Sequence, residues 1–248
     1  MFETIFSSSP LLERLKLVRC KGIEHLSIHA PHLKNYAVKN ELKSICFKHT
    51  PNLTEVSIIS YYLEENIQPG KASNLFKLLG ALPRIEKLYL GEYFLKFLAA
   101  GSVPDRLPTN TNHLKILNIC LGVNDVDEIS CALCLIRSSP NLQELEISVS
   151  TWGDDPIEPV LNFLEAQDCI NYTRDQLRIV KIKFIMGSKP QLELIKIQLA
   201  RSPLLERMSI QRREFINSSV GLTMTKELTE LPRASPKAEI IYLDLDPC

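Results

Sequence analysis

SPLLERLKL at residues 9–17 and SPLLERMSI at residues 202–210 are nearly the same stretch, written at the two ends of a chain of 248 residues. A catalytic motif is seldom duplicated in this way, whereas a structural unit often is. Both copies contain the frame Leu-x-x-Leu-x-Leu/Ile, and its last two apolar positions alternate with polar residues. That alternation has the period of a short strand with one buried face. The repetition therefore predicts a fold that stacks one small strand-containing unit.

The same frame recurs along the whole chain. It falls on Leu12-Leu15-Leu17, Ile23-Leu26-Ile28, Leu33-Tyr36-Val38, Leu42-Ile45-Phe47, Leu53-Val56-Ile58, Ile85-Leu88-Leu90, Leu114-Leu117-Ile119, Leu142-Leu145-Ile147, Leu177-Val180-Ile182 and Leu205-Met208-Ile210. A Ser-Pro, Thr-Pro or Leu-Pro pair often precedes the frame, as in SPLL, TPNL and LPRI. Proline supplies a fixed turn there without interrupting the hydrogen-bonded ladder.

The spacing of the frames predicts how they are arranged. Early frames start about ten residues apart, which is too short for an intervening helix, and later ones about thirty apart, which leaves room for one. If every second early frame lies on the outer side of a coil, the inner strands start at 12, 33, 53, 85, 114, 142, 177 and 205. These intervals predict an α/β leucine-rich-repeat solenoid. Its curved parallel sheet lines the concave side, with short strands or helices on the convex side.

Apolar spacing of three and four residues predicts helices between the later strands. They are expected in SNLFKLLGALP (73–83), DVDEISCALCLIRSSP (125–140), EPVLNFLEAQ (158–167) and KPQLELIKIQLA (189–200). Asp125 and Glu128 have the spacing of a capping box, and Pro190 suits a helix start. The proline-containing stretch 101–112 is expected to be a loop.

Composition limits the partners and the compartment. Lys plus Arg and Asp plus Glu both number 29, and this zero net charge argues against a dedicated nucleic-acid or membrane-surface binder. No apolar run approaches the roughly 20 residues of a membrane-spanning helix, and no signal peptide is recognisable. Seven scattered cysteines suit a reducing compartment. These features predict an intracellular protein, cytoplasmic or nuclear.

Two residue groups invite a metal or redox interpretation. Cys131-x-x-Cys134 has redox or zinc spacing, but the predicted helix turns both thiols toward its buried side and no second pair follows. His25, His29 and His32 fall across two strands and a turn, without a cysteine or carboxylate set beside them. Packing cysteines and ordinary surface histidines are therefore expected, with no metal site.

Enzyme motifs receive no better support. PGKAS (69–73) resembles a phosphate loop but has Glu65 where the first glycine is needed and Ala72 in place of Ser/Thr. Asp154, Asp155 and Glu158 are expected to favour a helix N-terminus rather than a cation. No Gly-x-Ser-x-Gly stretch is present. The expectation is a protein that is not an enzyme and needs no cofactor.

Several stretches resemble a known family. LPRIEKLYL, FLKFLAAGSVPDRLP, HLKILNI and SPNLQELEI look like the leucine-rich-repeat region of plant F-box proteins. QLRIVKIKFIMGSKPQLELIKIQLARSPLLERMSI with LTELPRASPKAEIIYLD looks like the FBD domain that closes such proteins, and RASPKAEI is its most specific part. The resemblance implies a repeat region over 1–168. It also implies an FBD domain over 169–248 that continues the solenoid.

The resemblance also implies a function. Such proteins are substrate-recognition subunits of Skp–cullin–F-box ubiquitin ligases, in which an F-box docks to the ligase and the repeats select a target. No F-box is recognisable in this sequence. We therefore expect a protein-binding module of this receptor type, which meets ligase subunits only if an F-box is supplied elsewhere. The alternative is a stand-alone scaffold or competitor, such as a truncated gene product, that binds a partner without directing its degradation.

The repeat register predicts which residues could contact a partner. Polar positions between the buried strand positions face the concave side, where solenoids bind. The candidates are Arg14, Lys16, Lys39, Glu55, Lys87, Tyr89, Ile116, Asn118, Glu144, Glu146, Lys181, Lys183 and Arg207. Basic residues lie toward the two ends of this list and Glu144 and Glu146 lie between them. Tyr89 and Ile116 are the expected apolar anchors.

Overall fold

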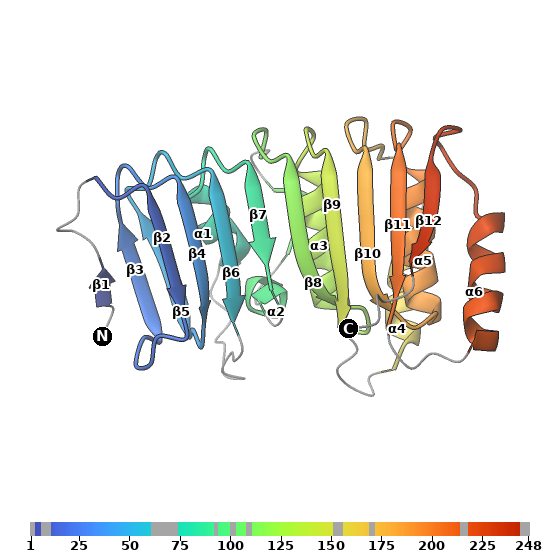
Figure 1. Ribbon diagram of the computed structural model, residues 1–248, viewed down its shortest axis with the longest axis horizontal. Helices are drawn as coiled ribbons and strands as arrows, with labels where there is room; N and C mark the ends of the chain where they lie inside the picture. The colour runs from blue at the N-terminus through green and yellow to red at the C-terminus, as the bar shows by residue number, and fades with distance from the viewer. Residues whose placement is uncertain are drawn as a thin grey trace.

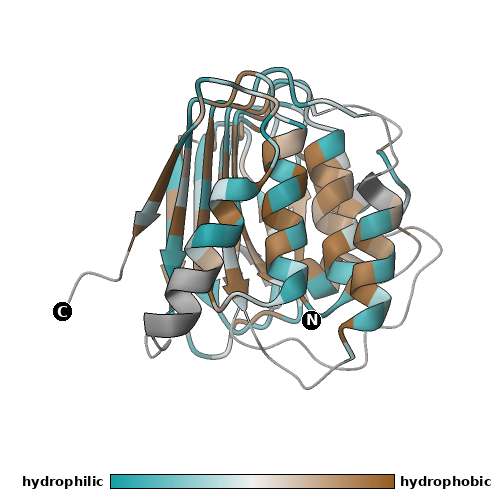
Figure 2. Ribbon diagram, turned by 90° about the vertical axis from the view of Figure 1, so that its right-hand side faces the viewer, coloured by the Kyte–Doolittle hydropathy of each residue, from teal (hydrophilic) through white to brown (hydrophobic). Residues whose placement is uncertain are grey.

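The protein forms two layers in the computed structural model. The structure describes residues 3–5, 11–60, 74–91, 94–99, 103–107, 111–150, 156–168, 172–213 and 218–243. Strands stand side by side along the long axis of the molecule, nearly in chain order, with helices behind them (Figure 1). Seen from its C-terminal end, the sheet forms one layer and the helices the other (Figure 2).

The inner sheet contains nine parallel strands in the order β12-β11-β10-β9-β8-β7-β6-β4-β2. Their bounds are β2 Arg14–Val18, β4 Asn35–Asn40, β6 Glu55–Ser60, β7 Lys87–Leu90, β8 Ile116–Gly122, β9 Glu144–Ser150, β10 Ile179–Ile185, β11 Arg207–Arg212 and β12 Glu239–Leu243. Every inner strand predicted from the frames is confirmed. The last strand, β12, follows a frame one residue shorter and was not predicted.

The early coils carry a second sheet on their outer side. It consists of β1 (Glu3–Ile5), β3 (His25–His29) and β5 (Ser44–Lys48), in the order β1-β3-β5. This confirms that alternate early frames lie on the outside, because β3 and β5 come from the frames between the inner strands. The two sheets pack directly: the rings of Tyr36 and Phe47 meet edge to face with their centres 5.4 Å apart.

Helices replace the outer strands after β6. They are α1 (Asn74–Gly80), α2 (Phe94–Ala99), α3 (Val126–Arg137), α4 (Glu158–Asp168), α5 (Lys189–Ala200) and α6 (Ser218–Glu230). The four predicted helices are confirmed, and residues 103–107 of the predicted loop contain no helix or strand. The helices α2 and α6 were not predicted. The first is too short for its period to be read, and the second buries a face marked by Met224 and Leu228 alone among its described side chains.

The start of α3 differs in detail from the predicted capping box. Asp125 caps the helix, and its carboxylate accepts hydrogen bonds from the amides of Asp127 and Glu128 at 2.9 and 3.1 Å. The Glu128 carboxylate accepts instead from the amide of Gly122, at 2.8 Å. Glu128 therefore ties the helix to the end of β8 rather than closing a box around the cap.

The apolar positions of the frame stack into the core. Val56, Leu88, Leu117 and Leu145 are paired strand to strand in register, and each is 0% exposed. Burying one such side chain contributes about 1.5–3 kcal/mol. A single coil has nothing to bury its leucines against, so the coils are stable only as a stack.

One hydrogen-bond pattern keeps successive coils in register. The carbonyl of Lys34 accepts from the amides of both Thr54 and Glu55, at 2.9 and 3.0 Å. Among the described residues, the carbonyls that accept two amides in this way between inner strands belong to Glu13, Lys34, Thr54, Glu86, Lys115, Gln143 and Arg178. The carbonyl of Glu24 does the same between the outer strands, accepting from Lys43 and Ser44. Because the bond falls at the same place in each coil, corresponding side chains are aligned across the sheet.

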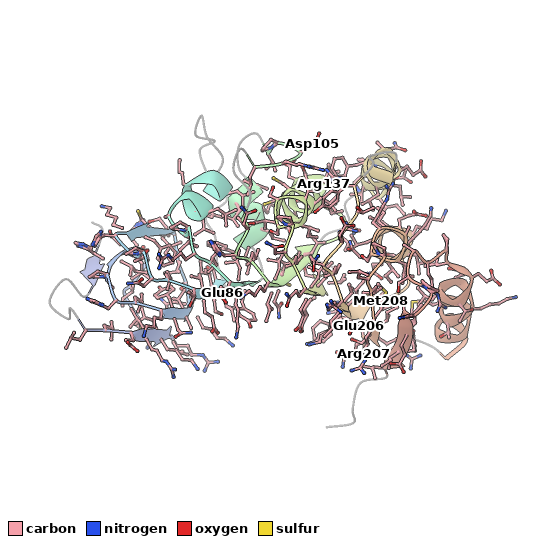
Figure 3. The ribbon with its side chains drawn as sticks, turned by 90° about the horizontal axis from the view of Figure 1, so that it is seen from above. Glu86, Asp105, Arg137, Glu206, Arg207 and Met208 are labelled. Carbon is pink, nitrogen blue, oxygen red and sulfur yellow. The ribbon has the colours of Figure 1, made fainter. Side chains whose placement is uncertain are left out.

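The sheet is bent, with the helices on the outer side of the bend (Figure 3). Asp105 and Arg137 lie on the helix side in this view, whereas Glu86, Glu206 and Arg207 lie on the sheet side. A helix is about 10 Å wide and neighbouring strands are about 4.8 Å apart, so a layer of helices needs more room than the strands that it covers. The predicted concave face is confirmed as the face away from the helices.

Within the described part of the chain, none of the helices has the length and apolar character needed to cross a membrane.

Candidate functional site on the concave face

Strand register aligns the side chains of the concave face into rows that cross the sheet. Row A contains Arg14, Asn35, Glu55, Lys87, Ile116, Glu144, Ile179, Arg207 and Glu239. Row B lies two residues further along each strand and contains Lys16, Ala37, Ser57, Tyr89, Asn118, Glu146, Lys181, Ser209 and Ile241. These side chains are exposed or half-buried, while most of those between the rows are buried.

All the residues predicted for this face lie on it. Lys39 and Lys183 fall in a third row, two residues beyond row B, and the other predicted residues belong to rows A and B. Their role in binding a partner remains a prediction. Residues of the face absent from the predicted set include Ile179, Glu239 and Ile241. The last two lie on the unrecognised strand β12.

Strand register places lysines of β10 beside the glutamates of β9 on this face. In the sequence, Glu144 and Glu146 form an acidic centre between basic ends. In the sheet, Lys181 Nζ lies 2.5 Å from Glu144 Oε1 and 4.0 Å from Glu146 Oε2, and Lys183 Nζ lies 2.6 Å from Glu146 Oε1. The hydrogen bond from Lys181 to Glu144 raises the pKa of the lysine above its usual value. The predicted acidic centre is therefore compensated by the next strand.

A further pair extends this compensation toward the C-terminal end. Arg207 Nε lies 3.6 Å from Glu239 Oε2, and both side chains are exposed. Like the lysine–glutamate pairs, it joins opposite charges on neighbouring strands. The strip from β9 to β12 therefore contains cross-strand pairs of opposite charge. Ile179 and Ile241 are half-buried among them. This half of the face is mixed in character and has no single sign of charge.

The N-terminal half of the face has a different balance. Arg14 and Lys16 are exposed on β2, and Lys39 is half-buried on β4. The nearest carboxylate of row A belongs to Glu55, which accepts a hydrogen bond from Asn35 Nδ2 at 2.9 Å. Among the described concave-face residues of β2, β4 and β6, cations therefore outnumber carboxylates.

The same half contains a trough of about 430 Å³. Its lining comes from β2, β4, β6 and β7 and comprises Lys16, Leu17, Val18, Ala37, Val38, Lys39, Glu55, Ser57, Ile59 and Tyr89. Ala37 and Ser57 occupy row B between Lys16 and Tyr89. Because both are small, they leave space between two long side chains. The sequence predicted the residues of the walls but not the hollow.

Tyr89 and Ile116 were the predicted anchors. They lie on adjacent strands, in neighbouring rows, and both are half-buried. Partial burial and the neighbouring carboxylates of Glu55, Glu144 and Glu146 raise the pKa of the Tyr89 phenol. The phenol therefore stays protonated and can donate a hydrogen bond at the edge of the trough.

Phe184 is an exposed apolar residue that the sequence did not single out. It has φ +63° and 38% exposure, and the pairing of β10 with β11 shifts register between Ile182 and Ile185. The shift inserts one residue, turns Phe184 to solvent and returns Ile185 to the core. No signal in the alternating sequence marks this bulge, since Phe184 sits where a buried residue is expected.

The residues considered for other chemistry have structural surroundings. Cys131 and Cys134 are buried in α3, and burial raises the pKa of both thiols, that of Cys134 to about 11, so neither is a reactive thiolate. This confirms packing cysteines. His25 Nδ1 is hydrogen-bonded with Ser44 Oγ at 2.9 Å, and the ring of His29 packs edge to face on His49.

The remaining motifs lie largely outside the described residues. Residues 69–73, which contain PGKAS, and Asp154 and Asp155 are not described, while Glu158 is in the first turn of α4. Among the described residues no group of three His, Cys, Asp or Glu side chains is placed to hold a metal ion.

A curved parallel sheet built from Leu-x-x-Leu-x-Leu coils, with outer strands or helices, defines a leucine-rich-repeat solenoid. A family model described as the LRR repeats of FBD-associated F-box protein At5g56370 matches residues 1–147. The match covers more than half of the chain, which therefore belongs to this family of F-box-associated leucine-rich repeats.

A curated relative extends the likeness over nearly the whole chain. F-box/FBD/LRR-repeat protein At1g13570 from Arabidopsis thaliana is 35% identical over 247 residues, which is 98% of this chain and 59% of that protein. The chain thus spans somewhat more than half the length of the relative. No solved structure matches the chain.

Proposed function

We propose that the chain is a protein-binding module that holds a target protein on its concave face, as the target-selecting part of an F-box receptor of a ubiquitin ligase. The observation that carries the proposal is the register of rows A and B, which presents an uninterrupted strip of accessible side chains across nine strands. Solenoids bind along such strips. Membership of an F-box-associated repeat family supports the ligase setting.

We propose a division into a repeat region (1–168) and an FBD domain (169–248) on the basis of family resemblance. The two parts are not proposed to fold as separate units. β9 on one side of the boundary pairs with β10 on the other through Leu145 and Val180. The Tyr172 hydroxyl donates a hydrogen bond to the carbonyl of Ile136 at 3.1 Å, again across the boundary. These contacts support the proposal that residues 169–248 continue the solenoid.

The test is partner capture with matched variants. The full chain would be expressed in plant cells fused to a proximity-labelling enzyme, as wild type, as Tyr89→Ala/Ile116→Asp on the concave face, and as Lys77→Glu on the exposed face of α1. Partners that depend on the concave face should disappear with the first variant and persist with the second. Equal labelling by all three forms would contradict the proposed function.

The lifetime of a captured partner in the cell distinguishes a ligase receptor from a stand-alone competitor. If the chain works with a ligase, its expression shortens the lifetime of the partner, and proteasome inhibition restores that lifetime. A lifetime that increases on expression would support a stand-alone competitor and remove the ligase role, while leaving protein binding in place.

A further inference from the structure

The turn before the inner strand β10 holds a buried charge at a position that is neutral in the other coils. In this turn the carbonyl of Arg174 accepts a hydrogen bond from the amide of Leu177, at 3.3 Å. Among the described residues, the same bond before the other inner strands is accepted by neutral residues, namely Ala30, Thr50, Leu82, Thr111, Ser139, Ser202 and Ser235. Arg174 therefore departs from the repeat, and such departures are typical of functional sites.

The guanidinium of Arg174 has few partners for a buried cation. The residue is 6% exposed. Its Nη1 donates to the carbonyl of Ile197 at 3.3 Å, and its Cζ lies 5.9 Å from the centre of the Tyr172 ring. Within the described part of the chain, its Nε has no hydrogen-bond partner and no carboxylate pairs with it. A buried charge is costly unless a counter-charge and hydrogen bonds accompany it.

Two further arginines lie close to this one. The Cζ of Arg106 is 4.9 Å from the centre of the same Tyr172 ring. Arg137 is buried, and its Nη1 lies 3.6 Å from Oδ1 of Asp105, whose side chain is 80% exposed. We call Arg106, Arg137 and Arg174 together with Tyr172 the arginine cluster. It lies on the helix side of the solenoid, where Figure 3 labels Asp105 and Arg137.

The arginines of the cluster influence one another electrostatically. Burial lowers the pKa of Arg174 to about 10, and the positive charges of Arg137 and Arg201 act in the same direction. Burial also lowers the pKa of Arg137, a shift that Asp105 opposes and Arg106 reinforces. An anion beside these side chains would relieve the repulsion between their like charges.

We propose that the arginine cluster binds a phosphate-type oxyanion, to whose oxygens Arg106 and Arg174 donate hydrogen bonds. A guanidinium carries its N–H donors in a planar fork that matches such an anion. Arg106 is exposed and Arg174 is buried, so the anion meets the first at the surface and the second beneath it. Because the cluster lies on the helix side, this is a second site, separate from the concave face and its partner.

Isothermal titration calorimetry of the full chain with inorganic phosphate tests the proposal, at an ionic strength held constant with sodium chloride. We expect one phosphate to bind the wild-type chain. Arg106→Gln and Arg174→Gln should each weaken this binding by about tenfold or more, because each removes charge-assisted hydrogen bonds.

A second ligand, O-phosphoserine, distinguishes a free ion from a phosphate group carried by a larger molecule. If it binds as tightly as inorganic phosphate, the site accepts a phosphate monoester. If only inorganic phosphate binds, the site takes the free ion. Either result supports the proposed site and identifies the source of the anion.

The matched control is Arg84→Gln, which removes the same charge from an exposed position before β7. Its affinity for phosphate should stay within about twofold of wild type, because distant surface charges are screened. Circular dichroism melting in chloride verifies that each variant is folded, and the exposed Arg106→Gln decides the test if Arg174→Gln does not fold. The proposal is overturned if wild type binds no phosphate, or if Arg106→Gln binds it as tightly as Arg84→Gln. The titration involves no partner protein, so its outcome does not depend on the proposed function.

Discussion

The side-chain nitrogen of Lys181 on β10 lies 2.5 Å from a carboxylate oxygen of Glu144 on β9. Thirty-seven positions separate the two residues in the chain, and the register of the two strands brings them together. The pair helps to neutralise the centre of the concave face. The trough lies toward the N-terminal end of the same face, away from this pair.

The Lys181–Glu144 pair should have a small and pH-dependent effect on stability. Lys181→Met is expected to lower the free energy of unfolding by about 0.5 kcal/mol at neutral pH, since both side chains are partly exposed and solvent screens their attraction. Glu144 raises the pKa of Lys181 above its usual 10.5, so the folded state holds this proton more tightly. The contribution is fully present below pH 10.5 and fades as pH rises through the folded-state pKa.

Denaturant unfolding of wild type and Lys181→Met measures this effect. The difference between the two proteins should be present at neutral pH and shrink above pH 10.5. A difference that grows with alkaline pH would contradict the assignment.

Tyr172 is expected to hold together the parts of the solenoid on either side of residue 168. Its hydroxyl donates to the Ile136 carbonyl, and the guanidinium carbons of Arg106 and Arg174 lie 4.9 and 5.9 Å from the centre of its ring. Tyr172→Phe should cost about 1 kcal/mol, because it removes the hydrogen bond and keeps the ring. Tyr172→Leu should cost more, because it also removes the cation–π contacts. Equal midpoints of urea unfolding for the two variants would show that the ring contacts contribute nothing.

A leucine of the buried ladder should be far more sensitive than a leucine outside it. Leu117 is 0% exposed on β8, whereas Leu11 is 83% exposed before β2. Leu117→Ala removes apolar contacts on both neighbouring coils and should cost about 2–5 kcal/mol. Leu11→Ala should change the unfolding free energy by less than about 0.5 kcal/mol. Thermal melts of the two variants test this, and similar losses would argue against a stacked core.

At position 184 a glycine substitution should give a more stable protein than an alanine substitution. Its φ of +63° lies in the left-handed region, where a residue with a Cβ pays about 1–2 kcal/mol and glycine does not. We expect Phe184→Gly to be more stable than Phe184→Ala by about 1 kcal/mol. At an ordinary strand position alanine would be the more stable of the two. Chemical denaturation of the two variants decides between these cases.

Much of the fold was predictable because it is repeated locally. A frame such as Leu53, Val56 and Ile58 indicates which side of a strand is buried. The spacing between successive frames, short early in the chain and longer later, distinguishes outer strands from helices. Prediction failed where the pattern was short or altered. The six-residue helix α2 is too short for its period to be recognised, and the shortened frame before β12 hid a strand. The bulge at Phe184 breaks the alternation on which the prediction depends.

The structure of a single coil follows from local sequence. Leucine spacing, turn prolines and strand alternation are local features, and the geometry of each strand determines which of its residues are buried. The surface of the concave face, by contrast, depends on how the coils are assembled. Ion pairing of Glu144 with Lys181, and the hollow over Ala37 and Ser57 beside Tyr89, depend on which residues of different coils become neighbours. Register and coil length determine those neighbours, and neither is a property of any single repeat.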